Sequence, residues 1–359
     1  MKIKSKFKEY EIVLEKDESF FENLVKTDNA EFVIDKNVYA LYSELFKEIP
    51  IERLFLVEAT EENKIIDTAL EICEKITEIP AKRNATLISV GGGIIQDITG
   101  FVANITYRGI HWIFIPTTLL AASDSCIGGK TSLNYKKYKN LLGTFYPPDK
   151  IHICPQMFET LTEKDFKSGL GEVVKFNIMA GQQGLENIES SIDDLLERKP
   201  AVINRFVESS LAFKKQFIEI DEFDKGERIK LNFAHTFGHA IEVVTKYEIP
   251  HGTAVAIGMI MANEISAQRG LLNTEIVKRS ESILLKVIDI DSTLLEKPFE
   301  MYLNAIKKDK KQVGTSLTAV LISNYGKNGE LSIVHNVTET ELEKAINYFK
   351  EIYKEYHED

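Results

Sequence analysis

Three of the seven histidines of the chain fall within seventeen residues, in an apolar part of the sequence. His235 and His239 are four residues apart in LNFAHTFGHAIEVV, so a helix would place them on one face. His251 follows a short turn, at the start of HGTAVAIGM. Imidazole nitrogen binds Zn²⁺ well, and three protein ligands with one open position are typical of catalytic zinc. The cluster predicts a metal-binding or catalytic site, and the alternative is a set of packed or capping histidines.

A carboxylate in an apolar helical segment is a candidate for a further metal ligand. Glu172 lies in SGLGEVVKF, where burial of a carboxylate is costly unless it is paired or binds a metal. Lys175 comes three residues later and shares the same helix face. An exposed Glu–Lys pair is the alternative interpretation of these two residues.

Gly91-Gly92-Gly93 follows a buried, strand-like run and precedes a helix-like one. Glycines at such a turn let the backbone approach a pyrophosphate, which the helix N-terminus also attracts. The spacing is not the G-x-G-x-x-G fingerprint of ordinary dinucleotide-binding folds. The run therefore fits either a cofactor-binding turn or a plain tight turn.

Charged and amide side chains gather in segments rich in small residues. Such groups can clamp a phosphate and a carboxylate, so they indicate an anionic small-molecule substrate. The segments KKYK and KKDKK, taken alone, also fit solvated loops. Arg228 and Asn232 precede His235, and we expect all three on one helix. The candidates are Arg108, Asp124, Lys130, Lys139, Asn140, Arg228, Asn232, Lys310 and Lys311.

The elements that must position these residues are of two kinds. In the first part of the chain, short apolar runs alternate with helical patterns, which predicts a parallel sheet covered by helices. The strand-like runs are 31–35, 52–57, 85–90 and 111–115, and the helical ones are 38–48 and 64–77.

Helical patterns dominate from about 156 to 310, which differs from the first part. They cover 158–179, 199–220, 229–247 and 253–270. Strand-like runs return at 317–322 and 331–334, and 338–358 predicts an amphipathic helix. We therefore expect two domains, an α/β domain at 1–155 and a mostly helical domain at 156–359.

Composition limits the possible functions. The chain has 359 residues, 44% of them hydrophobic, enough for a sizeable core. Its net charge of −11 argues against a nucleic-acid-binding surface, which needs a surplus of Lys and Arg. Apolar runs are shorter than a membrane span, and the N-terminus lacks the apolar part of a signal peptide. Cys73, Cys126 and Cys154 fit neither a disulfide framework nor a CxxC metal site. We expect a cytoplasmic protein without nucleic-acid or membrane partners.

Several long phrases together resemble the sugar-phosphate cyclase family, and within it most of all the 3-dehydroquinate synthases. The phrases follow the family order over residues 89–258, with weaker matches before 85 (VIDKN, EENK) and after 270 (DKK). They are SVGGGIIQDITGF, TYRG, IPTTLLAASDSCIGGKT, KNLLGTFYPP, SGLGEVVK, DEFDKGERIKLNFAHTFGHAIE and HGTAVAIGM. The resemblance implies an N-terminal Rossmann-like, NAD-binding α/β domain and a mostly α-helical, metal-binding C-terminal domain. It places the active site in the cleft between the domains.

The same resemblance implies roles for individual residues. Glu172, His235 and His251 would bind Zn²⁺ or Co²⁺. His239 would transfer a proton, and Asp224 and Lys175 would also be catalytic. The NAD⁺ contacts would be Asp35, Asn37, Glu61, Lys64, Gly92, Gly93, Asp97, Thr117, Thr118 and Lys139. The substrate contacts would be Arg108, Asp124, Lys130, Asn140, Lys175, Lys214, Arg228, Asn232 and, from DKK, Lys310.

The reaction implied by the resemblance converts 3-deoxy-D-arabino-heptulosonate 7-phosphate to 3-dehydroquinate and phosphate. NAD⁺ would take a hydride from C5 and later return it, and the metal would polarise the hydroxyl. The ketone would acidify the neighbouring C–H, so phosphate could leave before ring opening and an intramolecular aldol step. This carbon–oxygen lyase step belongs to the shikimate pathway to chorismate and the aromatic amino acids. The resemblance also suggests a homodimer.

Three features depart from the pattern of the family. One is the GEExK phrase near the N-terminus, which is reduced to TEENK at 60–64. Gln96 stands where a glycine is usual, and Asp224 where a glutamate is usual. Three alternatives therefore accompany the main interpretation: another sugar-phosphate cyclase (2-deoxy-scyllo-inosose or valiolone type), an iron-type alcohol or glycerol dehydrogenase, and a non-catalytic binding protein. The intact GGKT segment at 128–131, with Arg228 and Asn232, favours a substrate that carries a carboxylate.

Overall fold

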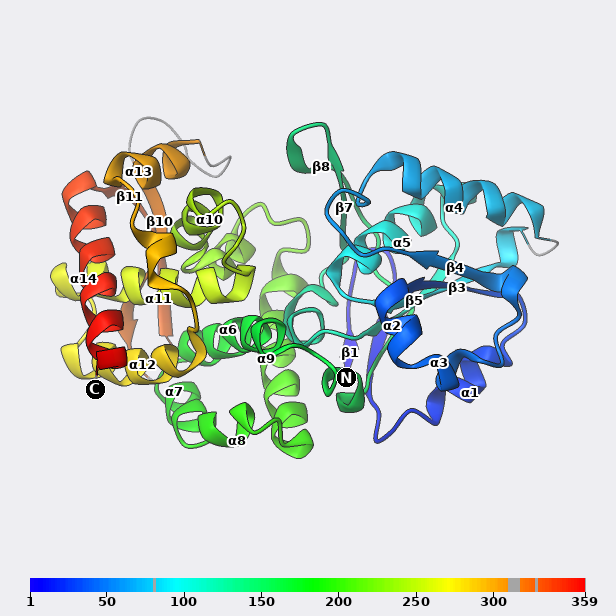
Figure 1. Ribbon diagram of the computed structural model, residues 1–359, viewed down its shortest axis with the longest axis horizontal. Coiled ribbons are helices and arrows are strands. Elements are labelled where there is room, and N and C mark those ends of the chain that lie inside the picture. The colour runs from blue at the N-terminus through cyan, green and yellow to red at the C-terminus, as the bar shows by residue number, and fades with distance from the viewer. Residues whose placement is uncertain (80–81, 309–316, 327–328, 359) are drawn as a thin grey trace. The chain divides into compact units, whose positions relative to one another are not determined.

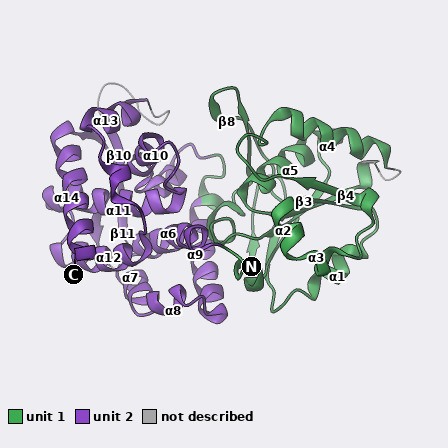
Figure 2. Ribbon diagram, in the orientation of Figure 1, with its two compact units in different colours: residues 1–161, 218–223 green, residues 162–217, 224–359 purple. Residues whose placement is uncertain are grey.

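The computed structural model describes residues 1–79, 82–308, 317–326 and 329–358 (Figure 1). The chain forms two compact units, coloured green and purple in Figure 2. The first unit contains Met1–Leu161 and Ile218–Phe223, and the second contains the rest of the chain from Thr162 onward.

The division between the units falls after Leu161 rather than after residue 155. Pro155–Phe158 forms a 3₁₀ turn whose Pro155, Met157 and Phe158 are buried. The Tyr42 hydroxyl donates to the Gln156 carbonyl oxygen at 2.9 Å, which ties this turn to the first unit.

The first unit is built around a seven-stranded sheet in the order β1-β2-β9-β6-β5-β3-β4 (Figure 1). Among these described strands, β1 and β2 are antiparallel and the other neighbouring pairs are parallel. The central strands are buried almost throughout and rich in Val, Ile, Leu and Phe, as strands covered on both faces must be. The strands are β1 (Lys2–Ile3), β2 (Tyr10–Leu14), β3 (Ala30–Asp35), β4 (Leu54–Val57), β5 (Thr86–Gly91), β6 (His111–Pro116) and β9 (Lys150–Ile153).

Helices and turns connect these strands, which confirms the predicted α/β class. The predicted helix at 38–48 is two helices, because Tyr42 leaves helical geometry with φ −116° and ψ 34°. The predicted helix at 64–77 is α4, which buries Ala69, Ile72 and Ile76 at spacings of three and four. The helices are α1 (Phe20–Val25), α2 (Lys36–Leu41), α3 (Ser43–Phe46), α4 (Ile66–Glu78) and α5 (Gly93–Ile105). The short turns are η1 (Ile51–Arg53), η2 (Lys82–Asn84), η3 (Thr106–Arg108), η4 (Ala121–Ser125) and η5 (Pro155–Phe158).

A separate two-stranded antiparallel sheet joins β7 (Lys130–Tyr135) to β8 (Tyr138–Phe145). The sequence analysis did not predict this hairpin. Because β8 is largely exposed, it lacks the alternation of apolar and polar residues that marks a half-buried strand.

The second unit is mostly helical, as predicted. Its α6 and α11 are buried on nearly every side, and α11 contacts α6, α10, α12 and α14. Strands β10 and β11 pair as an antiparallel hairpin. The elements are α6 (Glu163–Met179), α7 (Gln182–Glu189), α8 (Ile192–Leu196), α9 (Pro200–Ile220), η6 (Glu227–Asn232), α10 (His235–Val244), α11 (His251–Gln268), α12 (Thr274–Val287), η7 (Ser292–Leu295), α13 (Phe299–Lys307), β10 (Leu317–Tyr325), β11 (Gly329–Val337) and α14 (Glu339–Glu358).

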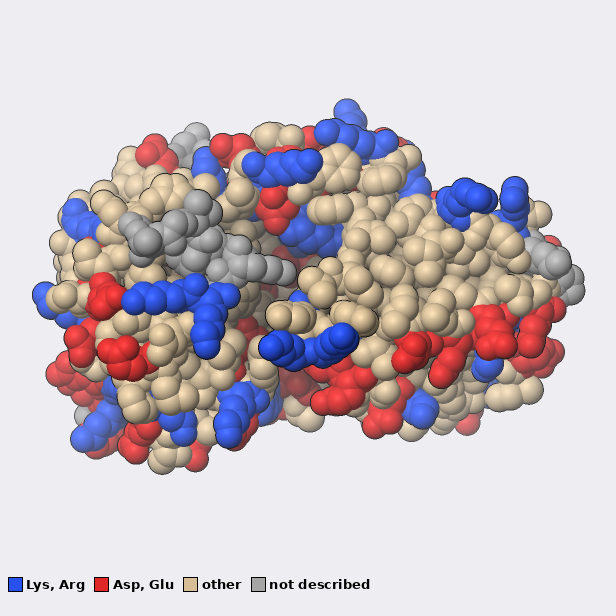
Figure 3. All heavy atoms as spheres, turned by 90° about the horizontal axis from the view of Figure 1, so that it is seen from above, with Lys and Arg blue, Asp and Glu red and all other residues tan. Residues whose placement is uncertain are grey.

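The surface is charged in a mixed pattern. Figure 3 shows acidic and basic side chains interspersed with uncharged ones over one face. None of the helices in the described residues combines the length and the hydropathy that a membrane span needs.

Candidate active site

Glycines let α6 and α11 of the second unit approach closely beside the predicted metal ligands. Gly171 precedes Glu172 on α6, and Gly252 follows His251 on α11. A Cβ atom at Gly252 would overlap the Ser168 carbonyl oxygen, and one at Gly171 would overlap the Gly252 carbonyl oxygen. This close approach brings Glu172 and His251 from separate helices to one place.

A further close contact at a glycine brings the start of α10 next to α11. A Cβ atom at Gly258 of α11 would overlap the Ala234 carbonyl oxygen. Ala234 has a left-handed backbone with φ 68°, which is unusual for a residue with a side chain. This conformation turns the chain so that His235 becomes the first residue of α10.

Glu172, His235 and His251 converge on one point, with their ligand atoms within 4.8 Å of one another. The Glu172 Oε1 atom is 3.5 Å from His235 Nε2 and 3.5 Å from His251 Nε2. The Glu172 side chain is fully buried, whereas those of His235 and His251 are 12% and 31% exposed. Two imidazoles and one carboxylate are a donor set typical of catalytic zinc, so these residues fit a divalent metal.

Each of the two histidines has a partner at its other ring nitrogen. His235 Nδ1 is 3.0 Å from the Phe233 carbonyl oxygen, and His251 Nδ1 is 3.3 Å from Glu242 Oε2. Because both partners are acceptors, they favour a proton on Nδ1 and leave the Nε2 lone pair for a metal. The ring orientations of His235 and His251 and the types of the three ligand residues therefore both fit a divalent metal bound through Nε2.

Lys175 completes the buried charges of this group. Its Nζ atom is 2.5 Å from Glu172 Oε2, and the two side chains are 2% and 0% exposed. The alternative interpretation of an exposed Glu–Lys pair is therefore wrong. Burial lowers the pKa of His251, but hydrogen bonds to Glu172 and Glu242 and their charges outweigh it and raise the pKa to about 10. A metal ion that binds Nε2 would therefore displace a proton from this ring.

His239 lies on α10 with His235, as the four-residue spacing predicts. The ring centroids are 5.5 Å apart, and the His239 ring is 5.9 Å from that of His251. His239 is thus a neighbour of both ligand histidines, and its predicted role in proton transfer stays a prediction.

The remaining polar candidates of the second unit include two buried cations. Lys214 on α9 is 6% exposed and Arg228 is 4% exposed. The expectation that Arg228 and Asn232 share a helix with His235 is wrong. Both belong to η6, which ends at Asn232, because Phe233 and Ala234 leave helical geometry.

Asp224 precedes η6 in a left-handed conformation with φ 58°. The predicted substrate residue Lys310, and its neighbour Lys311, lie outside the described residues.

In the first unit, four polar side chains form one network. Lys64 forms an ion pair with Asp97 and donates to Asn140 Oδ1 at 2.7 Å. The Ser132 backbone nitrogen and hydroxyl donate to Asp97 at 3.1 and 3.0 Å. Burial raises the pKa of Asp97, and Lys64 and Ser132 offset part of this effect. The structure thus brings together Lys64, Asp97 and Asn140, which the sequence analysis singled out separately.

Asn134 links this network to a second group. Its amide nitrogen donates to Glu61 Oε2 at 2.7 Å, and its amide oxygen accepts from the Asn140 backbone nitrogen at 2.9 Å. Lys139 Nζ is 3.5 Å from Glu61 Oε1. The sequence analysis missed Ser132 and Asn134. The signal that could have found them is their spacing of two on β7, which puts both on one face of that strand.

The carboxyl ends of the parallel strands carry the other cofactor candidates. Asp35 ends β3 and accepts a hydrogen bond from the Asn37 backbone nitrogen at 2.9 Å. From β3 the chain continues to β4 on one side, and from β5 it continues to β6 on the other. The crevice at the carboxyl ends of β3 and β5 is therefore a topological switch point, and α/β sheets bind ligands at such points.

The glycine turn at the end of β5 lies beside the turn after β6. The Thr117 backbone nitrogen donates to the Gly91 carbonyl oxygen at 2.9 Å. A Cβ atom at Gly92 would come within 3.1 Å of Thr118 Cγ2. The turn leads into α5, with Gly92 as its N-cap and Gly93 as its first residue. The alternative of a plain tight turn stays open, although strand, turn and helix follow the predicted order.

Gln96, the departure from the family pattern, joins α5 to η4. Its side-chain nitrogen donates to the Ser125 carbonyl oxygen at 2.7 Å, and the Ser125 hydroxyl donates back to Gln96 Oε1 at 2.7 Å. Gln96 is buried, and η4 also carries Asp124. Arg108 at the end of η3 and Lys130 at the start of β7 are exposed.

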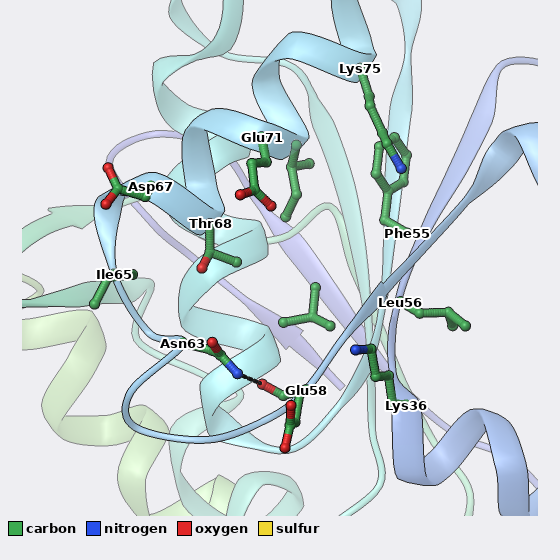
Figure 4. A pocket seen from close by; sticks show the side chains of 12 residues that line it. Lys36, Phe55, Leu56, Glu58, Asn63, Ile65, Asp67, Thr68, Glu71 and Lys75 are labelled. Atoms are coloured by element: carbon green, nitrogen blue, oxygen red, sulfur yellow. Dashed lines mark hydrogen bonds between the residues drawn. The ribbon is translucent and has the colours of Figure 1, made fainter.

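A pocket opens at the carboxyl end of β4, between this edge strand and the start of α4 (Figure 4). Its lining includes Lys36, Glu58 and Asn63, and the Asn63 amide donates to the Glu58 carbonyl oxygen at 3.1 Å. Lys36 and Asn63 are chain neighbours of Asp35 and Lys64, so the pocket adjoins the edge that carries the cofactor candidates.

Family models match most of this chain. Residues 54–168 match the 3-dehydroquinate synthase N-terminal model, and residues 169–312 match the 3-dehydroquinate synthase C-terminal model. Together these matches cover the parallel strands from β4 onward and the helices that carry Glu172, His235 and His251.

Curated relatives agree with these matches. The chain is 38% identical to a 3-dehydroquinate synthase of Clostridium tetani, over 82% of this chain and 79% of that protein. It is 36% identical to a 3-dehydroquinate synthase of Dictyoglomus thermophilum, over 96% and 97% of the two chains.

Among solved structures, the fold is similar to that of 2-epi-5-epi-valiolone synthase from Streptomyces hygroscopicus, which holds NAD⁺ and Zn²⁺. The TM-score is 0.82 at 24% identity, over 96% of this chain and 97% of that one, which shows a shared fold. The chain belongs to the 3-dehydroquinate synthase family.

Proposed function

We propose that this member of the family converts 3-deoxy-D-arabino-heptulosonate 7-phosphate to 3-dehydroquinate and inorganic phosphate, with catalytic NAD⁺ and a divalent metal. The names of the curated relatives, at 36–38% identity, support the substrate and the product. The observation that carries the proposal is the convergence of Glu172, His235 and His251 beside the buried Lys175. Such a centre can polarise a substrate hydroxyl, and a buried cation beside it can stabilise negative charge that develops there.

We assign the metal to Glu172 Oε1 and to the Nε2 atoms of His235 and His251. When bound, the metal supplies Lewis acidity to a substrate hydroxyl. Lys175 is the ionic partner of the Glu172 side chain, and a buried carboxylate needs such a partner. His239, whose ring neighbours both ligand rings, is placed to exchange a proton with a substrate oxygen or carbon.

We assign NAD⁺ to the carboxyl edge of the sheet in the first unit. When bound, NAD⁺ supplies a reversible hydride acceptor. Asp35 offers a carboxylate to a ribose hydroxyl, and Gly92 and Gly93 leave room for the pyrophosphate at the N-terminus of α5. Further contacts would come from Asn37, Glu61, Lys64, Asp97, Thr117, Thr118 and Lys139.

The substrate anions need cations that water does not screen. Lys214 and Arg228 are both buried, which suits a carboxylate that loses its own hydration on binding. Lys130 and Asn140 would hold the phosphate, and Arg108, Asp124 and Asn232 would orient the sugar hydroxyls. Asp224 and Lys175 complete the proposed catalytic group.

The test is phosphate release by purified protein given the heptulosonate 7-phosphate, a small amount of NAD⁺ and Zn²⁺, with NADH absorbance followed in the same sample. We expect many phosphates per NAD⁺ and a steady, low NADH level. Stoichiometric NADH would instead indicate a dehydrogenase. Activity only on a sugar phosphate without a carboxylate would indicate another cyclase branch, and zinc binding without turnover would indicate a binding protein.

Two further expectations from the resemblance stay proposals. We propose a homodimer, which sedimentation velocity of the purified chain tests directly. We also propose that the chain acts in the cytoplasm. Cys73, Cys126 and Cys154 form no disulfide in the described part of the chain, as expected in a reducing compartment.

A further inference from the structure

The two histidines at the proposed metal site are oriented by different kinds of acceptor. His235 Nδ1 faces a backbone carbonyl, that of Phe233, at 3.0 Å. His251 Nδ1 faces a side chain, the carboxylate of Glu242, at 3.3 Å. A backbone acceptor persists whatever residue supplies it, whereas a carboxylate acceptor depends on one side chain. The orientation of His251 therefore depends on an identifiable residue.

Glu242 is held where this interaction is strong. It lies on α10, seven residues after His235, so the helix that supplies one ligand histidine also supplies the orienting group of the other. The Glu242 side chain is 14% exposed, which weakens the screening of its charge by water. His251 begins α11, after Pro250, so its ring has no preceding helical turn to restrict it.

We propose that Glu242 is a positioning residue for the metal site. It accepts the Nδ1 proton of His251, fixes the ring with Nε2 toward Glu172, and strengthens Nε2 as a ligand through its negative charge. This inference rests on the metal site of the proposed function. It assigns Glu242 no contact with the substrate or the metal.

The test measures zinc affinity by competition with a chelator, which does not depend on activity. We expect Glu242→Ala to weaken zinc binding by about 10- to 100-fold, as loss of such a partner typically does. Glu242→Gln keeps an acceptor without the charge and should recover most of the loss. Glu248→Ala removes an exposed carboxylate nearby and serves as the matched control.

A second readout separates orientation from folding. In the zinc-loaded protein labelled with ¹⁵N-histidine, we expect a slowly exchanging Nδ1 proton of His251 in the wild type and in Glu242→Gln. The same proton should exchange rapidly in Glu242→Ala, because it then faces water. Unchanged exchange and unchanged zinc affinity in Glu242→Ala would overturn the inference.

Two outcomes distinguish failure of the proposed metal site from failure of the positioning role of Glu242. If the wild type binds no zinc, the proposed metal site itself fails. His239, Glu242 and His251 also form a group within ligand distance of one another. If the wild type binds two zinc ions and Glu242→Ala only one, Glu242 is a ligand of a second site and its positioning role is wrong.

Discussion

The two units of this protein gather their polar groups in different ways. In the α/β unit, the network comes from the loop before α4, from α5 and from the β7–β8 hairpin, and its members range from the buried Lys64 through the partly exposed Asp97 and Ser132 to the exposed Asn140. In the helical unit, Glu172 and Lys175 are fully buried on a helix packed through glycines. The first arrangement suits a cofactor that brings its own hydrogen-bonding groups. The second suits a metal, whose ligands must be held before it binds.

The difference predicts unequal tolerance of change. The network around Asp97 is open to water at Asn140 and partly at Asp97 and Ser132, so water can replace part of what is lost when one member is removed. In a buried ionic pair water cannot do so, since loss of one partner leaves the other charged and without water.

Glu172→Ala should abolish zinc binding and phosphate release. It also leaves Lys175 buried without its carboxylate, so we expect the free energy of unfolding to fall by about 3–5 kcal/mol. The matched control is Glu227→Ala, which removes the same i,i+3 partner from Lys230 where both side chains are partly exposed. Glu227→Ala should lower the free energy of unfolding by less than about 1 kcal/mol. If urea denaturation shows the same fall in the free energy of unfolding for both variants, the contrast between buried and exposed ion pairs is wrong.

Gly252→Ala tests whether backbone contact between helices positions the ligands. A methyl group at Gly252 overlaps the Ser168 carbonyl oxygen, so α6 and α11 must separate. We expect about 1–3 kcal/mol of lost stability from overpacking. We also expect about 100-fold lower turnover, since a displacement of roughly 1 Å misplaces His251.

Gly326→Ala is the control for this change, because a Cβ atom at Gly326 meets no heavy atom within 4 Å. Wild-type zinc affinity and turnover in Gly252→Ala would show that the helices tolerate separation. The metal site would then tolerate change as well as the polar network around Asp97 is expected to.

Asp97→Asn addresses the α/β unit directly. Asparagine keeps the shape and can still accept from Ser132, but it loses the ionic attraction to Lys64. Loss of one charge-assisted hydrogen bond corresponds to about 10- to 100-fold weaker NAD⁺ binding. Asp97→Asn also leaves the buried Lys64 without its ionic partner, but Lys64 still donates to Asn140, so we expect a smaller loss of stability than in Glu172→Ala. A loss of stability as large as that in Glu172→Ala, measured in the same denaturation series, would remove the distinction between the units.

The sequence predicted the elements that bury continuous apolar runs. Strands β3, β5 and β6 and helices α4, α6 and α11 were found because burial on one or both faces leaves a period in the residue types. The hairpin β7–β8 was missed because its exposed β8 has no such period. The break between η6 and α10 was missed because the left-handed Ala234 is not a residue type that favours that conformation.

The site was predictable as a set of residue types but not as a set of contacts. The spacing of His235, His239 and His251 indicated a cluster, and a surface pair of Glu172 and Lys175 was an equally good interpretation until their burial was known. The Phe233 carbonyl has no sequence signature, since every residue has one. Gln96 was noticed as a departure, but only the structure shows that its amide exchanges two hydrogen bonds with Ser125.

The smallest expected effect lies at the edge of the helical unit, where Arg269 meets Glu341. Arg269 Nε and Nη2 are 2.6 and 2.8 Å from the two Glu341 carboxylate oxygens, and this partner lowers the pKa of Glu341 to about 2. A lowered carboxyl pKa adds stability that is fully present above the unfolded value of about 4.3. That stability is lost as the pH falls through about 2.

Glu341→Gln should therefore lower the free energy of unfolding by about 1 kcal/mol at pH 7, and the deficit should shrink as the pH falls from about 5 to 2. Urea denaturation at pH 7, 4 and 2.5 measures this, with Glu343→Gln, an exposed change on the same helix, as control. A deficit that stays constant down to pH 2.5 would mean that packing, not charge, holds α14. A deficit near that of Glu172→Ala would mean that partial exposure does not weaken an ion pair in this protein. The contrast between the fully buried pair and the partly exposed pairs would then lose its physical basis.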